Sequence, residues 1–286
     1  MTFCHNWAQP VRSASGKSVT IFPGCASYHG AADWVITMSC MPFAFLMLMF
    51  SCQPTSMGED SLDHILQRNA LALGSSTAWQ QVESLRIELD IREPGFEVTG
   101  TYLATREIGM RIDIKAGDEA VFSEGLYQDV AWQWTPGNGY RNANEQGTAA
   151  LRHGIEGPGK FYTLKDFHER GGKVSLSEAP GFAEPGEWQL EFTLPDGHLV
   201  YYFVDQSSYL TTRELTRRAF HPDQNPLEVT IESRFTDPVS VDGIVRFRTI
   251  ESRNLETGEW LGTTKITAVE HNAPVPKGFY SGEELR

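Results

Sequence analysis

Few residues in this sequence of 286 have the type and spacing that catalysis needs. It contains no Gly-x-Ser-x-Gly elbow, no His-Glu-x-x-His motif, no phosphate-cradling Gly loop and no cysteine pair with metal-ligand spacing. His168-Glu169 has no second histidine four residues on, and His221-Pro222-Asp223 is typical of a solvated turn. Glu187, Glu191 and Asp205 lie on expected strands and could supply the carboxylate pair of a glycoside hydrolase. We therefore expect no catalytic residue, no metal and no cofactor, with the hydrolase kept as an alternative.

The composition excludes several classes of protein. The formal net charge is -13, with 24 Lys and Arg residues against 37 Asp and Glu residues. Nucleic-acid binding depends on clustered Lys and Arg that neutralise phosphates, so we expect no nucleic-acid partner. The chain is 40% hydrophobic and 21% charged, which is ordinary for a globular protein and rules out disorder throughout. No apolar run approaches the ~20 residues of a membrane-spanning helix.

The amino-terminal part has the pattern of an export signal. No charged residue occurs between Asp33 and Glu59, and residues 41–50 form an apolar run. The run has the length of a signal-peptide hydrophobic region and is too short to cross a bilayer. Ser51-Cys52 follows it and resembles the cleavage site of bacterial lipoproteins, where the cysteine is acylated. We therefore expect Cys52 to anchor an exported protein to the periplasmic face of a bacterial membrane, with the outer membrane favoured.

The position of this signal within the chain is unusual. A start at Met38 or Met41 would give a signal of ordinary length, so we expect residues 1–37 to be a mispredicted extension. The alternative is that the apolar run is a buried strand or helix of the fold. Cysteine usage favours export, because no cysteine follows Cys52 and the body then has no internal disulfide.

The remaining chain predicts a single α+β domain over residues 59–286, joined to the anchor by a polar tether, residues 52–58. A helix is expected from Asp60 to Leu73, where apolar residues form one stripe and Gly74 ends it. From residue 84 the apolar period switches to two, which indicates strands joined by short Gly- or Pro-containing turns. The expected strands are 84–92, 96–104, 108–114, 120–125, 130–134, 188–192, 198–205, 209–215, 227–235, 244–250 and 263–270. Residues 142–153 and 161–167 are expected to be helical, which gives a curved antiparallel β-sheet with an N-terminal helix and a mid-chain helical cover.

A series of short motifs follows the order of these elements. The motifs are Gly74 after the first helix, Glu124-Gly125, Ala131-Trp132-Gln133, Pro136, Asp196-Gly197, Tyr202-Phe203-Val204-Asp205, Tyr209-Leu210, Val241-Asp242-Gly243-Ile244 and Glu270-His271-Asn272. In this order they resemble the outer-membrane lipoprotein-sorting and lipoprotein-carrier superfamily (LolA/LolB-like), from about Gly58 to Tyr280. Each motif is weak alone. The chain departs from the family at Thr236-Asp237-Pro238, where many members have Asp-Tyr-Arg, and the arginine that closes the lid of the carrier has no clear match.

The resemblance implies an incomplete β-barrel with a helical lid, whose apolar hollow shelters acyl chains. Binding such a chain requires a concave apolar surface, because each buried methylene contributes about 0.8 kcal/mol. The candidate lining residues are one strand face together with the apolar side of the second mid-chain helix: Tyr102, Ile112, Phe122, Trp132, Trp134, Phe161, Leu164 and Phe167. An ordinary closed core would show the same alternation of apolar and polar residues.

Three functional hypotheses follow. The leading one is a lipid-anchored periplasmic protein that binds a lipoprotein acyl chain or another lipid, in lipoprotein sorting or envelope maintenance. The second is an envelope-stress or regulatory module of the same fold that acts through an envelope protein partner. The third is the secreted, carboxylate-dependent glycoside hydrolase introduced above.

Overall fold

A computed structural model of the chain describes residues 61–177, 181–222 and 225–286. The predicted signal sequence, the anchor Cys52 and the tether of residues 52–58 lie outside the described residues. Within the described part, no helix has the length and apolar character needed to cross a membrane.

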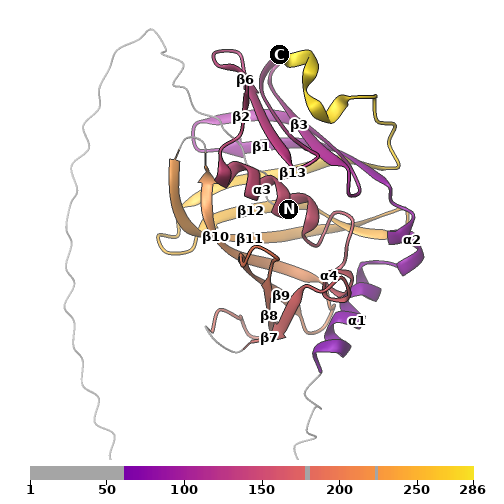
Figure 1. Cartoon of the computed structure of the whole chain (residues 1–286). Helices are drawn as coiled ribbons and strands as arrows, with labels where there is room; N and C mark the ends of the chain where they lie inside the picture. Colours follow the sequence, from indigo (N-terminus) through magenta and orange to yellow (C-terminus); the bar gives the residue numbers. More distant parts are fainter. Residues whose placement is uncertain (1–60, 178–180, 223–224) are drawn as a thin grey trace, which may run out of the picture. The chain divides into compact units, whose positions relative to one another are not determined.

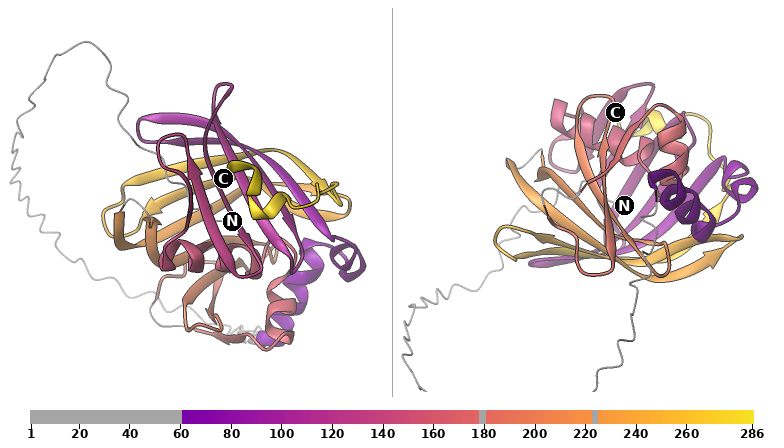
Figure 2. Two further views of the ribbon diagram at one scale, coloured as in Figure 1. Left: turned by 45° about the horizontal axis from the view of Figure 1, so that its top comes forward. Right: turned by 90° about the horizontal axis from the view of Figure 1, so that it is seen from below.

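Thirteen strands form one antiparallel sheet, whose ends are the two short strands β6 and β7 (Figure 1). The first long strand pairs with the last, so the sheet order is β6-β5-β4-β3-β2-β1-β13-β12-β11-β10-β9-β8-β7. The sheet is strongly curved but not closed, which confirms the expected incomplete barrel (Figure 2). The strands are β1 (Ser84–Glu93), β2 (Phe96–Thr105), β3 (Gly109–Ala116), β4 (Glu119–Tyr127), β5 (Val130–Thr135), β6 (Gly139–Asn142), β7 (Lys173–Leu176), β8 (Glu187–Thr193), β9 (Leu199–Asp205), β10 (Thr211–His221), β11 (Asn225–Val241), β12 (Ile244–Asn254) and β13 (Trp260–His271).

The alternation of apolar residues decides which face of the sheet is buried. In β1, Leu85, Ile87, Leu89 and Ile91 are at most 2% exposed, whereas the residues between them point to the other side. Directly opposed residues of antiparallel strands share a face, so the face that carries these four residues can be followed across the sheet. We call it the inner face, and the opposite side the outer face.

The first helix begins and ends where local chemistry requires. In α1 (Leu62–Leu73) the N-cap is Ser61, one residue later than expected, and its hydroxyl accepts from the His64 amide. Gly74 ends the helix with φ of 140° and pairs with Ile244 of β12. A side chain at Gly74 would have its Cβ 2.5 Å from the Gly243 carbonyl oxygen, so the helix can meet the sheet here only through glycine.

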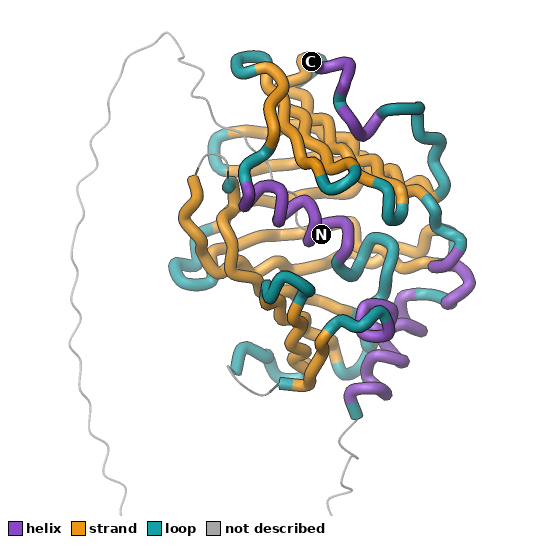
Figure 3. The backbone as a smooth tube through the Cα atoms, viewed as in Figure 1, coloured by secondary structure: helices purple, strands orange, loops and turns teal. Residues whose placement is uncertain are grey.

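The mid-chain helices lie on the inner side of the curved sheet (Figures 1 and 3). They are α3 (Glu145–Glu156), capped by Asn144, and α4 (Leu164–Glu169), whose Thr163 and Asp166 form a capping box. Helix α3 packs against β4 and β5, and α4 packs against α1. The helical cover expected from the sequence is present, except that Phe161 precedes α4 and residues 139–142 form strand β6. A further short helix, α2 (Ser76–Gln80), carries the buried Trp79.

Two apolar cores lie on the inner face. The larger core joins the inner residues of β1–β4 to Leu151 and Ile155 of α3. The smaller core joins Ile65 and Leu66 of α1 to α4 and to the inner residues of β8 and β9. The segment between α3 and α4 runs from one core to the other, so the space beneath it is bounded by both.

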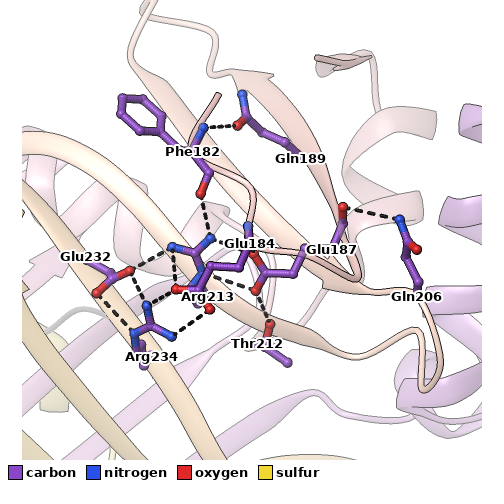
Figure 4. A network of polar contacts seen from close by, with 9 residues as sticks. All are labelled: Phe182, Glu184, Glu187, Gln189, Gln206, Thr212, Arg213, Glu232 and Arg234. Atoms are coloured by element: carbon purple, nitrogen blue, oxygen red, sulfur yellow. Dashed lines mark hydrogen bonds and ion pairs between the residues drawn. The ribbon is translucent and has the colours of Figure 1, made fainter. Parts of the chain in front are cut away.

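The outer face carries two other features. The C-terminal 3₁₀ turns, η1 (Phe279–Ser281) and η2 (Glu283–Leu285), bring Tyr280 against Leu103 of β2. On β10, Arg213 is 3% exposed and pairs with Glu187 at 2.6 Å and Glu232 at 2.7 Å, while it donates to the Phe182 carbonyl (Figure 4). The hydrogen bond to Phe182 fastens the segment before β8 to the outer face, and the two ion pairs link β8, β10 and β11.

Candidate ligand-binding site

A hollow lies on the inner face beneath the segment that links α3 to α4. It is lined mostly by apolar side chains, is open to solvent at its mouth, and has a free volume of about 80 Å³. We call it the apolar hollow; its lining residues are Leu73, Trp79, Pro158, Gly159, Thr163, Leu164, Tyr202, Thr211, Glu214, Phe235, Val245, Arg246, Phe247, Ile250 and Ile266.

The sheet supplies the aromatic wall of the apolar hollow. Phe235 of β11 and Phe247 of β12 lie with ring centroids 5.8 Å apart, and Phe235 is directly opposite Ile250 in the strand register. These two rings are only partly buried, although they pack against the larger core. Partly buried aromatic rings facing a hollow give an apolar surface that the protein's own side chains leave uncovered.

A second, more polar pocket adjoins the apolar hollow and shares Pro158, Tyr202 and Glu214 with it. Its wall contains two histidines, His153 of α3 and His198 next to β9, whose rings stack at 4.4 Å. His153 Nε2 lies 2.5 Å from Asp196, and His198 Nε2 lies 2.8 Å from the Thr216 hydroxyl. Burial and the neighbouring His153 lower the pKa of His198, which favours its neutral form.

One charged side chain lies inside the apolar hollow with carbonyl groups for partners. Arg246 of β12 is 4% exposed and donates to the backbone oxygens of Gly159 at 2.7 Å and Lys160 at 3.0 Å. Its guanidinium lies 4.7 Å over the Trp79 ring and 3.1 Å from His271 Nε2. Burial lowers the pKa of Arg246 to about 10, so it is still a cation at neutral pH.

The residues expected to line the site fall into three groups. Leu164 lines the apolar hollow. Tyr102, Ile112, Phe122 and Phe161 belong to the larger core, and Phe167 belongs to the smaller one, where it packs 5.4 Å from Phe192. Trp132 and Trp134 form the third group.

The expectation that these tryptophans share a face with Tyr102 is wrong. In the register, Tyr102 is opposite Ile112 and Ile112 is opposite Glu124, whereas Trp132 is opposite Gly125, one residue further on. Because side chains alternate along a strand, Trp132 and Trp134 point to the outer face. The inner positions of β5 are held by Ala131 and Gln133, so the aromatic residues of this strand do not mark its inner face.

Trp132 is nevertheless buried, because the C-terminal turns cover it. Its Nε1 donates to the Tyr280 carbonyl at 2.7 Å, and its ring stacks on Tyr140 at 5.4 Å. A Cβ at Gly125 would lie 2.7 Å from the indole, so glycine provides the room for this ring on the neighbouring strand. Trp132 therefore holds the C-terminal segment against the outer face.

Several lining residues were not expected from the sequence, above all Trp79, Arg246, Phe235 and Phe247. Arg246 had a usable signal, since it shares parity with the buried Ile244 and Ile250 in an alternating strand. A charged residue at an inward position marks either a functional group or a buried ion pair. No comparable signal exists for Trp79, whose place in the hollow depends on where α2 meets β12.

Of the three carboxylates considered for a hydrolase, Glu191 hydrogen-bonds to Tyr201, and the other two are engaged elsewhere. Glu187 pairs with Arg213 on the outer face. Asp205 accepts hydrogen bonds from the hydroxyls of Ser207 and Ser208 and from the Ser208 amide, which lower its pKa to about 2. Among the described residues, Glu214 is the one carboxylate that lines either inner pocket. The two inner pockets therefore offer no pair of carboxylates. The described part of the chain contains no group of three or more His, Cys, Asp or Glu residues that could hold a metal ion.

Comparison with known proteins identifies the fold. A LolA superfamily protein from Nitrosomonas europaea aligns with a TM-score of 0.51 and 12% identity over 79% of this chain and 99% of that chain. A DUF1329 family protein from Desulfovibrio piger aligns with the same TM-score of 0.51 and 12% identity, over 79% of this chain and 100% of that chain. No family model and no curated protein matches the sequence. The chain therefore has the fold of LolA superfamily structures, which confirms the resemblance inferred from the motifs.

Proposed function

We propose that this protein is an exported, lipid-anchored binding protein that takes an acyl chain into the apolar hollow. The binding domain is residues 59–286, and the tether of residues 52–58 joins it to an acylated Cys52. The role that fits such a protein is in lipoprotein sorting or in maintenance of a bacterial envelope, at the periplasmic face of the outer membrane.

The observation that carries this proposal is the apolar hollow itself. It is bounded by two separate cores, walled by Phe235, Phe247 and Ile250, and covered by the segment that links α3 to α4. Each methylene that leaves water contributes about 0.8 kcal/mol, so a hydrocarbon chain laid along these side chains gains several kcal/mol. The fold of LolA superfamily structures is consistent with this use.

Filling the hollow tests the proposal. Val245 lines the hollow and is partly buried, so Val245→Trp adds bulk where a ligand would lie. We expect the variant to weaken binding of a fluorescent fatty-acid probe at least tenfold. The matched control is Val130→Trp, which should leave binding unchanged because Val130 is 52% exposed at the start of β5.

The same preparation can be examined for lipid that copurifies with the protein, by native mass spectrometry. Lipid bound to the wild type and lost in Val245→Trp would support the proposal. Equal probe binding by the two tryptophan variants, or absence of binding to the wild type, would contradict it. A stable complex with an envelope protein in place of lipid uptake would favour the regulatory alternative.

A further inference from the structure

The donors in the apolar hollow outnumber the acceptors available to them. The two terminal nitrogens of Arg246 have partners in Gly159, Lys160 and His271, but its Nε is buried with no partner. Trp79 lines the same hollow, and its indole Nε1 is also buried with no partner. A buried N–H group without an acceptor is unfavourable, and both of these groups can only donate.

Arg246 also lacks a counter-ion. Among the described residues no carboxylate pairs with it, and Asp242 reaches it only through His271, to whose Nδ1 it bonds at 3.0 Å. Glu214 lies on the far strand of the hollow, where it already interacts with another group. A buried cation whose partners are carbonyls and an imidazole is best stabilised by an anion that enters from outside.

We propose that the apolar hollow selects anionic amphiphiles, with a carboxylate or phosphate oxygen of the ligand accepting a hydrogen bond from Arg246 Nε and the hydrocarbon chain lying against Phe235 and Phe247. This inference rests on the proposed function, since it requires that a hydrocarbon chain occupies the hollow. It goes further by naming the head group. A free fatty acid or a single-chain lipid phosphate has the required oxygen, whereas a neutral ester or alcohol of the same length does not.

The first experiment compares three ligands with one chain length: dodecanoate, dodecyl phosphate and dodecan-1-ol. Calorimetric titration of the wild-type protein at pH 8 keeps the acids ionised and Arg246 charged. We expect at least one of the acids to bind about tenfold or more tightly than the alcohol, as a hydrogen bond to a charged group implies. The stronger of the two acids identifies the head group as carboxylate or phosphate.

Variants then connect the preference to one side chain. In Arg246→Met the acid and the alcohol should bind equally, and in Arg246→Lys part of the preference should persist. Arg248→Met is the matched control, because Arg248 is exposed two residues along the same strand and should keep the full preference. If Arg246→Met does not fold, the wild-type comparison decides the question.

The two proposals fail in different ways. Equal affinity of the wild type for dodecanoate, dodecyl phosphate and dodecanol would overturn the head-group inference and leave acyl-chain binding intact. A preference that survives in Arg246→Met would overturn it as well. If none of the three ligands binds, the proposed function itself is wrong.

Discussion

The two buried tryptophans Trp132 and Trp79 have different roles in the structure. Trp132 is a packing residue: it is 1% exposed, lies on the outer face, and is held by Tyr140 and the Tyr280 carbonyl. Trp79 is just as buried, at 3%, but it lines the apolar hollow beside Arg246. Both indoles have one N–H donor. Within the described residues, the protein provides an acceptor for the N–H of Trp132 but none for that of Trp79.

This distinction predicts the behaviour of Trp132→Ala. Removal of a large, fully buried aromatic side chain costs about 3–5 kcal/mol of the free energy of unfolding, which urea denaturation can measure. We expect folded Trp132→Ala to bind a fluorescent fatty-acid probe as the wild type does, because the indole is on the opposite face of the sheet from the hollow. Trp134→Ala is the control and should cost less, since Trp134 is only partly buried. Loss of probe binding at unchanged stability would place Trp132 in the site instead.

Among the elements of the fold, strands on the outer face are linked by ion pairs between arginine and glutamate side chains. Arg246 in the hollow has no such carboxylate partner in the described part of the chain. Arg213 contacts Glu187 and Glu232, both of which are at most 10% exposed in their side chains, and its guanidinium lies 4.0 Å from the centre of the Phe203 ring. Arg234 extends the network to Glu184 (Figure 4). The network ties β8, β10 and β11 together from outside, in addition to the backbone pairing of the sheet.

Removing the centre of this network should be costly. In Arg213→Met the buried Glu187 loses its cation and Glu232 keeps only Arg234, and breaking a buried ion pair on one side costs about 3–5 kcal/mol. Arg234→Met is the matched control: its side chain is 39% exposed, so solvent screens the loss and we expect well under half of that effect. Chemical denaturation of the two variants at neutral pH gives the comparison. Equal losses in the two variants would show that burial does not set the strength of these pairs.

At the scale of the whole molecule, the proposed role depends on attachment to a membrane. The chain is acidic overall, and acyl chains on Cys52 would hold the proposed binding domain at a lipid surface without help from charge. A fixed anchor suits a protein that receives or retains a ligand at one membrane.

Replacement of the anchor tests this arrangement. Cys52→Ser should release the protein from isolated membranes into the soluble fraction and remove the mass of the attached lipid. Cys40→Ser is the control, because Cys40 precedes the proposed cleavage site and should leave membrane association unchanged. Membrane association that persists in Cys52→Ser would eliminate the anchor.

Much of the architecture followed from local signals in the sequence. The alternation in residues 84–92 predicted β1 within one residue at its C-terminal end, and Gly74 marked the end of α1, because strand period and helix capping are decided by neighbours in the chain. Strand β7 is not predicted, because its four residues at the edge of the sheet carry little apolar pattern. Strand β6 is not predicted either, because it has only four residues and the expected helix begins at its last residue, Asn142.

The class of fold, an antiparallel sheet with helical segments on one side, follows from the local sequence, since each hairpin and helix is encoded within a short stretch of chain. The inward face of β5, the pairing of β1 with β13, and the meeting of Trp79 and Arg246 in one hollow follow only from the folded arrangement. Those facts depend on the register between strands far apart in the chain, and a shift of one residue would exchange the buried and exposed sets without altering the local pattern.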